Sequence, residues 1–236
     1  MRRRIGLVAF ACAIPLLGQT ARVPFVGCAS DGQAGPVEAL KDTSPLVKVD
    51  VSVARRLAYY KAFGFGVLAP RGWHCFGIYG SSGGDLFVAP QPMMWDDFSS
   101  GGRIFTGPII QIESTSGGGS GSSEVARVIA RVFPAYRWFP EGMINGGLGD
   151  GIVFGPYPND KLTVQSRRLV EFETPANSEG LGTTYRVEAS GDPIEGAAIL
   201  QGTNPDLLML TIRLPRELRD LAPIIIHQLE RENLAK

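Results

Sequence analysis

Short apolar runs, broken by glycine and proline, dominate the chain from residue 47 onward. Val47, Val49, Val51 and Val53 alternate with polar residues, and this period of two predicts a half-buried strand. The next ten residues, ARRLAYYKAF, consist mainly of good helix formers and predict a short helix. Later apolar runs between turn-forming clusters predict strands over 65–69, 74–79 and 85–89, and then within RIFTGPIIQIES.

The most regular helical pattern lies near 123–133. Its apolar positions recur at helical spacing and are Val125, Val128, Ile129, Val132 and Phe133. This spacing predicts an amphipathic helix that packs on a sheet or on another helix. Pro134 should end it.

The second half predicts a β-meander followed by a final helix. The expected strands cover 161–173, 183–189, 194–201 and 207–214, and turn-forming sequences separate them. A helix should run from about residue 216 to 233, with a bend at Pro223. Strands outnumber helices and follow one another without regular alternation, so the predicted class is α+β with a mostly antiparallel sheet. We expect one domain over 45–236, after an extended leader over 22–44.

The first 21 residues have the layout of a secretory signal peptide. Arg2, Arg3 and Arg4 precede an apolar run over 5–17, and small and polar residues follow. The run is about thirteen residues, whereas a permanent membrane anchor needs roughly twenty. We therefore expect export to the periplasm or the exterior, with no transmembrane segment in the mature chain.

Removal of the signal peptide also removes Cys12 and leaves two cysteines, Cys28 and Cys75. Two cysteines in an oxidising compartment predict a disulfide. Phe25, Val26 and Gly27 before Cys28 loosely match the lipobox of bacterial lipoproteins, so attachment of a lipid to Cys28 is the alternative. The same sulfur cannot serve both purposes.

Composition excludes some functions and leaves others open. The chain has 23 basic and 23 acidic residues, and no basic patch is interleaved with aromatic residues, so we expect no nucleic-acid partner. Only two histidines are present, and no Cys or His pair has the spacing of metal ligands. We expect neither a metal nor a cofactor, and the oligomeric state stays open.

Three strings resemble an uncharacterised family of secreted proteobacterial proteins: PFVGCASDGQAGP, LAYYKAFGFGVLAPRGWHCFGIYGSSG and TPANSEGLGT. That family carries no known activity. The order of elements around Pro70, Gly72 and Trp73, with a hairpin, a meander and a last helix, is also similar to the PsbP-like α+β fold. Members of that fold mostly bind partners, so this resemblance implies a binding protein.

The sequence Gly80-Ser81-Ser82-Gly83-Gly84 has the G-x-S-x-G spacing of a serine hydrolase. Ser82 would be the nucleophile, with His227 as the base and Asp192 or Asp206 as the acid. A nucleophile elbow requires a helix after the serine, whereas a strand follows here. We therefore interpret GSSGG as a hairpin turn and keep the hydrolase as the alternative function.

Apolar and aromatic side chains in two predicted loops are the leading candidates for binding. The first loop contains Met93, Met94, Trp95 and Phe98, and the second contains Tyr136, Trp138 and Phe139. Such residues are enriched in interface cores, and loops often carry function. The leading hypothesis is a binding or interaction module without intrinsic catalysis, whose partner is a protein or an apolar ligand. Burial of both loops in the core is the competing interpretation.

Overall fold

The structure is a computed structural model, and it describes residues 20–41, 47–99, 102–183 and 186–234. The predicted signal peptide, 1–21, lies outside these residues except for its last two positions. Within the described ranges, none of the helices has the length and apolar character needed to span a membrane.

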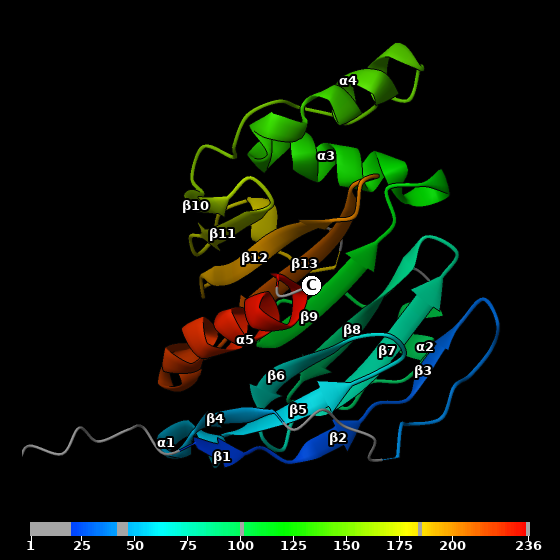
Figure 1. Cartoon of the computed structure of the whole chain (residues 1–236). Helices are drawn as coiled ribbons and strands as arrows, with labels where there is room; N and C mark the ends of the chain where they lie inside the picture. Colours follow the sequence, from blue (N-terminus) through cyan, green and yellow to red (C-terminus); the bar gives the residue numbers. More distant parts are fainter. Residues whose placement is uncertain (1–19, 42–46, 100–101, 184–185, 235–236) are drawn as a thin grey trace, which may run out of the picture.

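The apolar runs pair into a large mixed sheet that forms the centre of the molecule (Figure 1). Its eight strands, counted over the described residues, are in spatial order β10 (Lys161–Ser166), β11 (Leu169–Thr174), β12 (Ile194–Gln201), β13 (Asp206–Arg213), β9 (Ile109–Thr115), β8 (Gly83–Ala89), β7 (His74–Gly80) and β3 (Ser30–Gly32). Neighbouring strands are antiparallel except β3 and β7, which are parallel.

Two smaller sheets lie beside the large one. One contains β2 (Phe25–Gly27), β5 (Leu57–Lys61) and β6 (Gly66–Pro70), and β2 runs parallel to β5. The other pairs β1 (Thr20–Arg22) with β4 (Lys48–Asp50). The α+β class is therefore confirmed, whereas the prediction of a mostly antiparallel sheet is wrong because the sheet is mixed. The parallel pairs come from β2 and β3, in the predicted leader, where the sequence has no strand pattern.

Helices cover both faces of the large sheet (Figure 1). The α-helices are α1 (Val51–Ala54), α2 (Asp96–Ser99), α3 (Ser122–Val132), α4 (Trp138–Asn145) and α5 (Ala222–Leu234). Four short 3-10 turns in the described residues are η1 (Gly119–Gly121), η2 (Pro134–Tyr136), η3 (Leu181–Thr183) and η4 (Arg216–Leu221).

Strand alternation divides the buried side chains between two cores, one on each face of the large sheet. On β8, Leu86 and Val88 join the cluster that contains α5, β5 and β6, whereas Phe87 and Ala89 join the cluster that contains α3. The side chains of the other strands are divided between the two clusters in the same way, because successive side chains of a strand point to opposite faces. Polar side chains at the α3-facing positions are therefore buried under a helix.

The helix predicted for ARRLAYYKAF is wrong. α1 is a single turn that ends at Ala54, and β5 follows as the central strand of its sheet. Leu57, Ala58, Tyr59 and Tyr60 are all buried, so β5 is covered on both faces. A strand covered on both faces reads as a continuous apolar run, and tertiary packing then overrides the helix propensity of the segment.

The other predictions for the second half agree in part. The expected strand over 161–173 is the hairpin β10–β11, and the described residues of 183–189 contribute a single bridge, between Val187 and Phe105. The helix expected near 123–133 is α3, one residue earlier, and the expected final helix divides into η4 and α5. Pro223 lies in the first turn of α5, where a missing N–H costs little. α4, which the sequence suggested was a loop, is a helix.

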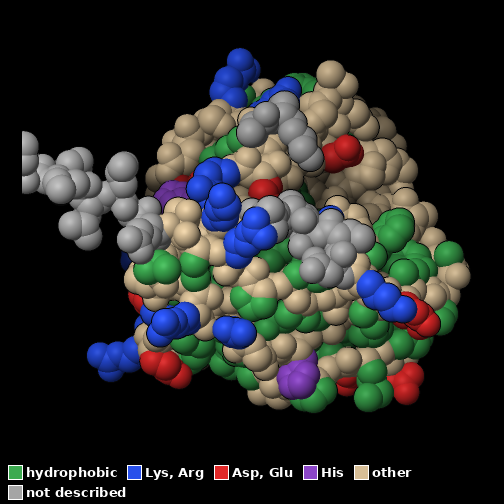
Figure 2. Space-filling model, turned by 60° about the horizontal axis from the view of Figure 1, so that its bottom comes forward, with side chains coloured by type: hydrophobic (Ala, Val, Ile, Leu, Met, Phe, Trp, Pro, Cys, Tyr) green, Lys and Arg blue, Asp and Glu red, His purple; other side chains and the backbone are tan. Residues whose placement is uncertain are grey.

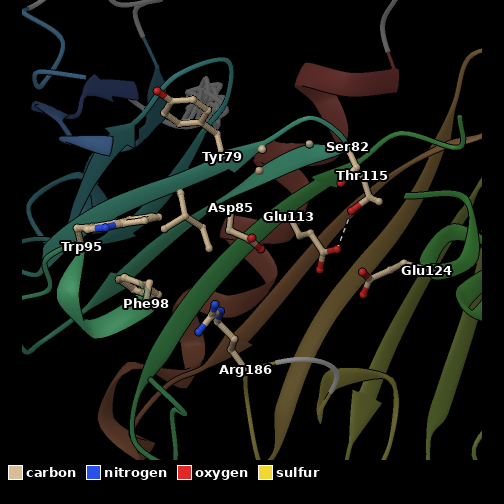
Figure 3. Close-up of a pocket in the computed structure, with 13 residues that line it drawn as sticks. Tyr79, Ser82, Asp85, Trp95, Phe98, Glu113, Thr115, Glu124 and Arg186 are labelled. Carbon is tan, nitrogen blue, oxygen red and sulfur yellow. Dashed lines mark hydrogen bonds between the residues drawn. The ribbon is translucent and has the colours of Figure 1, made fainter. Parts of the chain in front are cut away.

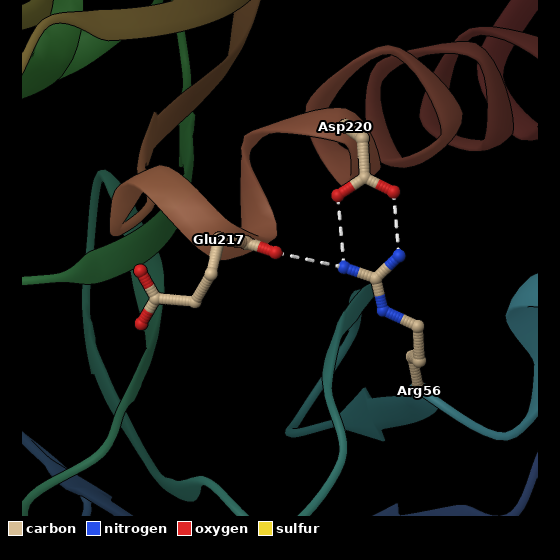
Figure 4. Close-up of polar contacts among 3 residues, drawn as sticks. All are labelled: Arg56, Glu217 and Asp220. Atoms are coloured by element: carbon tan, nitrogen blue, oxygen red, sulfur yellow. Dashed lines mark hydrogen bonds and ion pairs between the residues drawn. The ribbon is translucent and has the colours of Figure 1, made fainter.

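Two long-range links hold the N-terminal segment to the rest of the fold. Cys28 and Cys75 form a disulfide, as the cysteine count predicted, and it joins the segment between β2 and β3 to β7. The Arg56 guanidinium donates two hydrogen bonds to the Asp220 carboxylate, at 2.5 and 2.8 Å, and one to the Glu217 carbonyl at 3.1 Å (Figure 4). The second link holds the start of β5 to η4.

Candidate functional site

A pocket opens beside the turn of the β7–β8 hairpin, which is formed by the GSSGG sequence (Figure 3). Gly80 pairs with Gly83, so Ser81 and Ser82 form the turn, as predicted. Gly83 has a φ of +148°, and a Cβ atom there would lie 1.8 Å from the Ser114 carbonyl oxygen. Glycine at this position therefore lets the hairpin approach β9, and β9 supplies the floor of the pocket.

Two carboxyl groups on this floor lie directly opposite each other. Asp85 on β8 and Glu113 on β9 are register partners in the antiparallel ladder, and both face α3. Each is only 8% exposed. Like charges directly opposite across a strand pair are destabilising, and burial increases the cost. Such a buried pair of carboxyl groups therefore requires an explanation.

Each carboxyl group accepts one hydrogen bond from a neighbouring side chain. The Gln111 amide donates to Asp85 Oδ1 at 2.7 Å, and the Thr115 hydroxyl donates to Glu113 Oε1 at 2.7 Å. The second oxygen of each carboxyl group has no donor among the described residues. Figure 3 shows both side chains turned into the pocket. When both groups are ionised, the floor therefore offers two acceptor oxygens to a ligand.

An aromatic wall comes from the segment before and within α2. The Phe98 ring stacks on Phe87 with a centroid separation of 4.9 Å, and it is buried. This contact anchors α2 to the sheet. Trp95, one turn earlier, also lines the pocket but is 37% exposed, so its ring borders both the pocket and solvent.

Two further charged side chains line the pocket from other elements (Figure 3). Glu124 comes from the first turn of α3. Arg186 lies next to the Val187 bridge, and its guanidinium sits over the Phe98 ring, 5.3 Å from the centroid. The pocket thus combines three carboxyl groups with one guanidinium group among the described residues that line it.

The electrostatics of the pocket favour protonated carboxyl groups near neutral pH. Burial raises the pKa of Asp85 to about 7, and the hydrogen bond from Gln111 opposes this rise. Burial, followed by repulsion from Asp85, raises the pKa of Glu113 to about 8. Burial also raises the pKa of Glu124, against the attraction of Arg127. Perturbed carboxyl groups in a pocket are characteristic of functional sites.

The pocket volume of about 280 Å³ suits a small ligand. Its lining combines aromatic rings with a few convergent polar groups, which is the usual composition of a ligand site. In the described part of the chain, no group of three His, Cys, Asp or Glu side chains is placed to hold a metal ion.

The structure separates the predicted binding residues into two groups. Trp95 and Phe98 line the pocket, while Met93 is buried in the core and Met94 is exposed. The second group lies at α4 and η2, away from the pocket. There Phe139 is buried, Trp138 is exposed, and the Tyr136 hydroxyl accepts a hydrogen bond from Arg168 at 2.8 Å.

The residues of the hydrolase alternative lie in separate places. Ser82 lines the pocket on the α3-facing side, whereas His227 lies on α5, across the sheet, and contacts Glu230 at 3.1 Å. The Asp192 carboxylate pairs with Arg219, and Asp206 accepts hydrogen bonds from the Ser116 hydroxyl and the Gly117 amide. The sheet therefore separates Ser82 from His227, and no hydrogen bond joins the Ser82 side chain to either aspartate among the described residues.

Sequence reasoning missed the polar floor of the pocket, although a signal was present. Gln111, Glu113 and Thr115 take every second position of a strand in which Ile110 and Ile112 are the apolar residues between and before them. In a sheet covered on both faces, that alternation places polar side chains in the core. The opposition of Glu113 and Asp85 depends on strand register, which this alternation does not reveal.

Comparison with known proteins identifies no relative. No protein-family model matches the chain, and neither a curated protein nor a solved structure gives a significant match. The resemblances to a secreted proteobacterial family and to the PsbP-like fold therefore stay predictions.

Proposed function

We propose that this chain is an exported binding module without intrinsic catalytic activity, and that it takes a small ligand into the pocket beside the β7–β8 turn. The observation that carries the proposal is the meeting of Trp95 and Phe98 with the buried Asp85–Glu113 pair in one pocket. Aromatic walls with a few aimed polar groups are the usual means of recognising a small molecule.

One feature of the structure supports export. The disulfide between Cys28 and Cys75 is of a kind that persists in oxidising compartments. It also occupies the sulfur that a lipid anchor at Cys28 would need.

Hydrophobic, acidic and basic side chains are interspersed on the face shown in Figure 2, as expected for a protein whose charge is balanced.

Two matched tryptophan substitutions test the binding proposal. A library of small cationic, neutral and anionic compounds is screened against the wild-type protein by ligand-observed NMR. We expect Trp95→Ala to weaken the binders found, because Trp95 forms the exposed wall of the pocket. Trp138→Ala removes an equally large exposed ring elsewhere and should leave binding unchanged. Binding that depends on Trp138, or no binder at all, would contradict the proposal.

A serine hydrolase is the second candidate, because Ser82 lines the pocket. We favour the binding function over the hydrolase, because no imidazole base lies beside Ser82 among the described residues. Labelling with a fluorophosphonate probe decides between the two. We expect no labelling, and labelling of the wild-type protein that Ser82→Ala abolishes would establish the hydrolase.

A further inference from the structure

We propose that the pocket binds the ammonium end of a small organic amine between Asp85 and Glu113, with the apolar part of the amine against Trp95. This inference names the ligand class for the site and therefore rests on the binding function proposed above. Three observations support it: the unused oxygens, the charge of the lining, and the open aromatic face.

The unused oxygens indicate a donor ligand. Asp85 and Glu113 are both more than nine-tenths buried, and each points one oxygen without a donor from the described residues into the pocket. An ammonium group has three N–H donors and no acceptor. Placed between the two carboxylates, it satisfies both oxygens, and its charge removes the repulsion across the strand pair.

The charge of the lining favours a cation. Asp85, Glu113 and Glu124 supply three carboxyl groups, and Arg186 supplies one guanidinium group. Full ionisation therefore leaves the described lining with a net charge of −2, from three negative charges and one positive charge. This negative charge would repel an anionic ligand, whereas a monovalent cation would partly neutralise it.

The aromatic wall selects an amine that has an apolar body. Arg186 already covers Phe98, whereas Trp95 has no ring or cation stacked on it among the described residues. Its ring is partly open to solvent at the pocket. A bare metal cation would leave this surface unused, but an arylalkyl or alkyl amine covers it and gains a favourable contact.

Cation binding at this site must compete with protons. The raised pKa values of Asp85 and Glu113 mean that the empty pocket holds protons near neutral pH. The charged groups that face the pair are Glu124 from α3, which adds to the repulsion, and Arg186, which offsets it at Asp85. Amine affinity should therefore increase as pH rises from about 6 to about 8.5, with proton release on binding.

Three phenylalkyl probes of similar size and different charge test the ligand class. These are 2-phenylethylamine, which is cationic, 2-phenylethanol, which is neutral, and 3-phenylpropionate, which is anionic. Each is titrated into the full-length mature protein by calorimetry at about pH 6 and about pH 8.5. We expect the amine to bind most tightly, and to bind more tightly at the higher pH.

Amide substitutions at the floor test the residues. Glu113→Gln and Asp85→Asn keep the side-chain shape and remove a buried charge, so both variants should fold. We expect each to weaken amine binding by about tenfold or more, the usual effect of losing a hydrogen bond to a charged group. Glu179→Gln removes an exposed carboxylate elsewhere and should leave the affinity unchanged.

The outcomes separate this inference from the binding function on which it rests. If 2-phenylethanol or 3-phenylpropionate binds as tightly as the amine and depends on Trp95, the cation class is wrong and the binding function stands. The same conclusion follows if the three probes fail while other library compounds bind through Trp95. If neither the probes nor the library bind, both proposals fail. Amine affinity that is unchanged in Glu113→Gln would also overturn this inference.

Discussion

At the scale of single residues, the Asp85–Glu113 pair makes stability depend on pH. Both carboxyl groups have raised pKa values because they are buried, and Glu113 also because it faces Asp85. Through these two groups, the folded protein binds more protons than the unfolded chain between about pH 4, near the ordinary carboxyl pKa, and about pH 8. Their contribution to stability is therefore greatest at low pH and declines across this interval.

We predict that Glu113→Gln stabilises the protein increasingly as pH rises. Each carboxyl group reduces the free energy of unfolding by up to about 1.4 kcal/mol per pH unit across the interval, and the amide removes one of these contributions. The difference between variant and wild type should be small near pH 4 and level off above about pH 8. Urea unfolding at several pH values measures it. Glu179→Gln serves as the control, and a parallel pair of profiles for wild type and Glu113→Gln would contradict the prediction.

At the scale of elements, the N-terminal segment depends on links to elements far along the chain. β2 and β3 have three residues each and lie parallel to β5 and β7. Strands this short contribute few ladder hydrogen bonds. The disulfide lies between them, at the point where the chain passes from the small sheet to the edge of the large sheet. The disulfide therefore keeps β3 beside β7, the strand that leads into the pocket turn.

We predict that Cys28→Ala/Cys75→Ala lowers the free energy of unfolding by about 4 kcal/mol. The disulfide spans a sequence separation of 47, and closing a loop of this length restricts the unfolded chain by about that amount. Urea unfolding of the oxidised wild type and of the double variant measures the loss. Wild-type protein under reducing conditions should behave like the variant. A loss of less than about 1 kcal/mol would mean that the disulfide contributes little.

At the scale of the whole molecule, one sheet is shared by two cores. The large sheet contributes one side of its strands to the cluster beneath α5 and the other side to the cluster beneath α3. If the sheet unfolded on one side, the buried side chains of the other cluster would also be exposed to solvent. We therefore expect the described part of the chain to unfold as one cooperative unit.

We predict that both cores unfold together. Trp73 packs against the α5-side cluster, and Trp95 lies at the pocket on the α3 side. Two variants are made, one that keeps only Trp73 and one that keeps only Trp95, with the remaining tryptophans replaced by Phe. Each variant then reports on one side of the sheet. Both fluorescence transitions in urea should share a midpoint with far-ultraviolet circular dichroism, as expected for a two-state domain. Two separated midpoints would indicate two independent units.

The sequence by itself determined where many of the elements lie. Apolar runs and turn residues located β6, β7, β8, β9, β12 and β13 closely, and helical spacing located α3, because these patterns act over a few neighbouring residues. The count of cysteines predicted the Cys28–Cys75 disulfide. Loop composition also selected Trp95 and Phe98, which line the pocket.

Only the tertiary structure decided which distant segments meet. Burial on both faces made residues 57–61 a strand, against their local helix propensity. Ladder register placed Asp85 opposite Glu113, and packing of α2 and α3 enclosed them with Trp95 and Glu124. Local patterns encode which face a side chain takes, whereas register and enclosure depend on the pairing of strands far apart in the sequence. The fold therefore creates the site, because the local sequence around each residue does not show which distant residues it will meet.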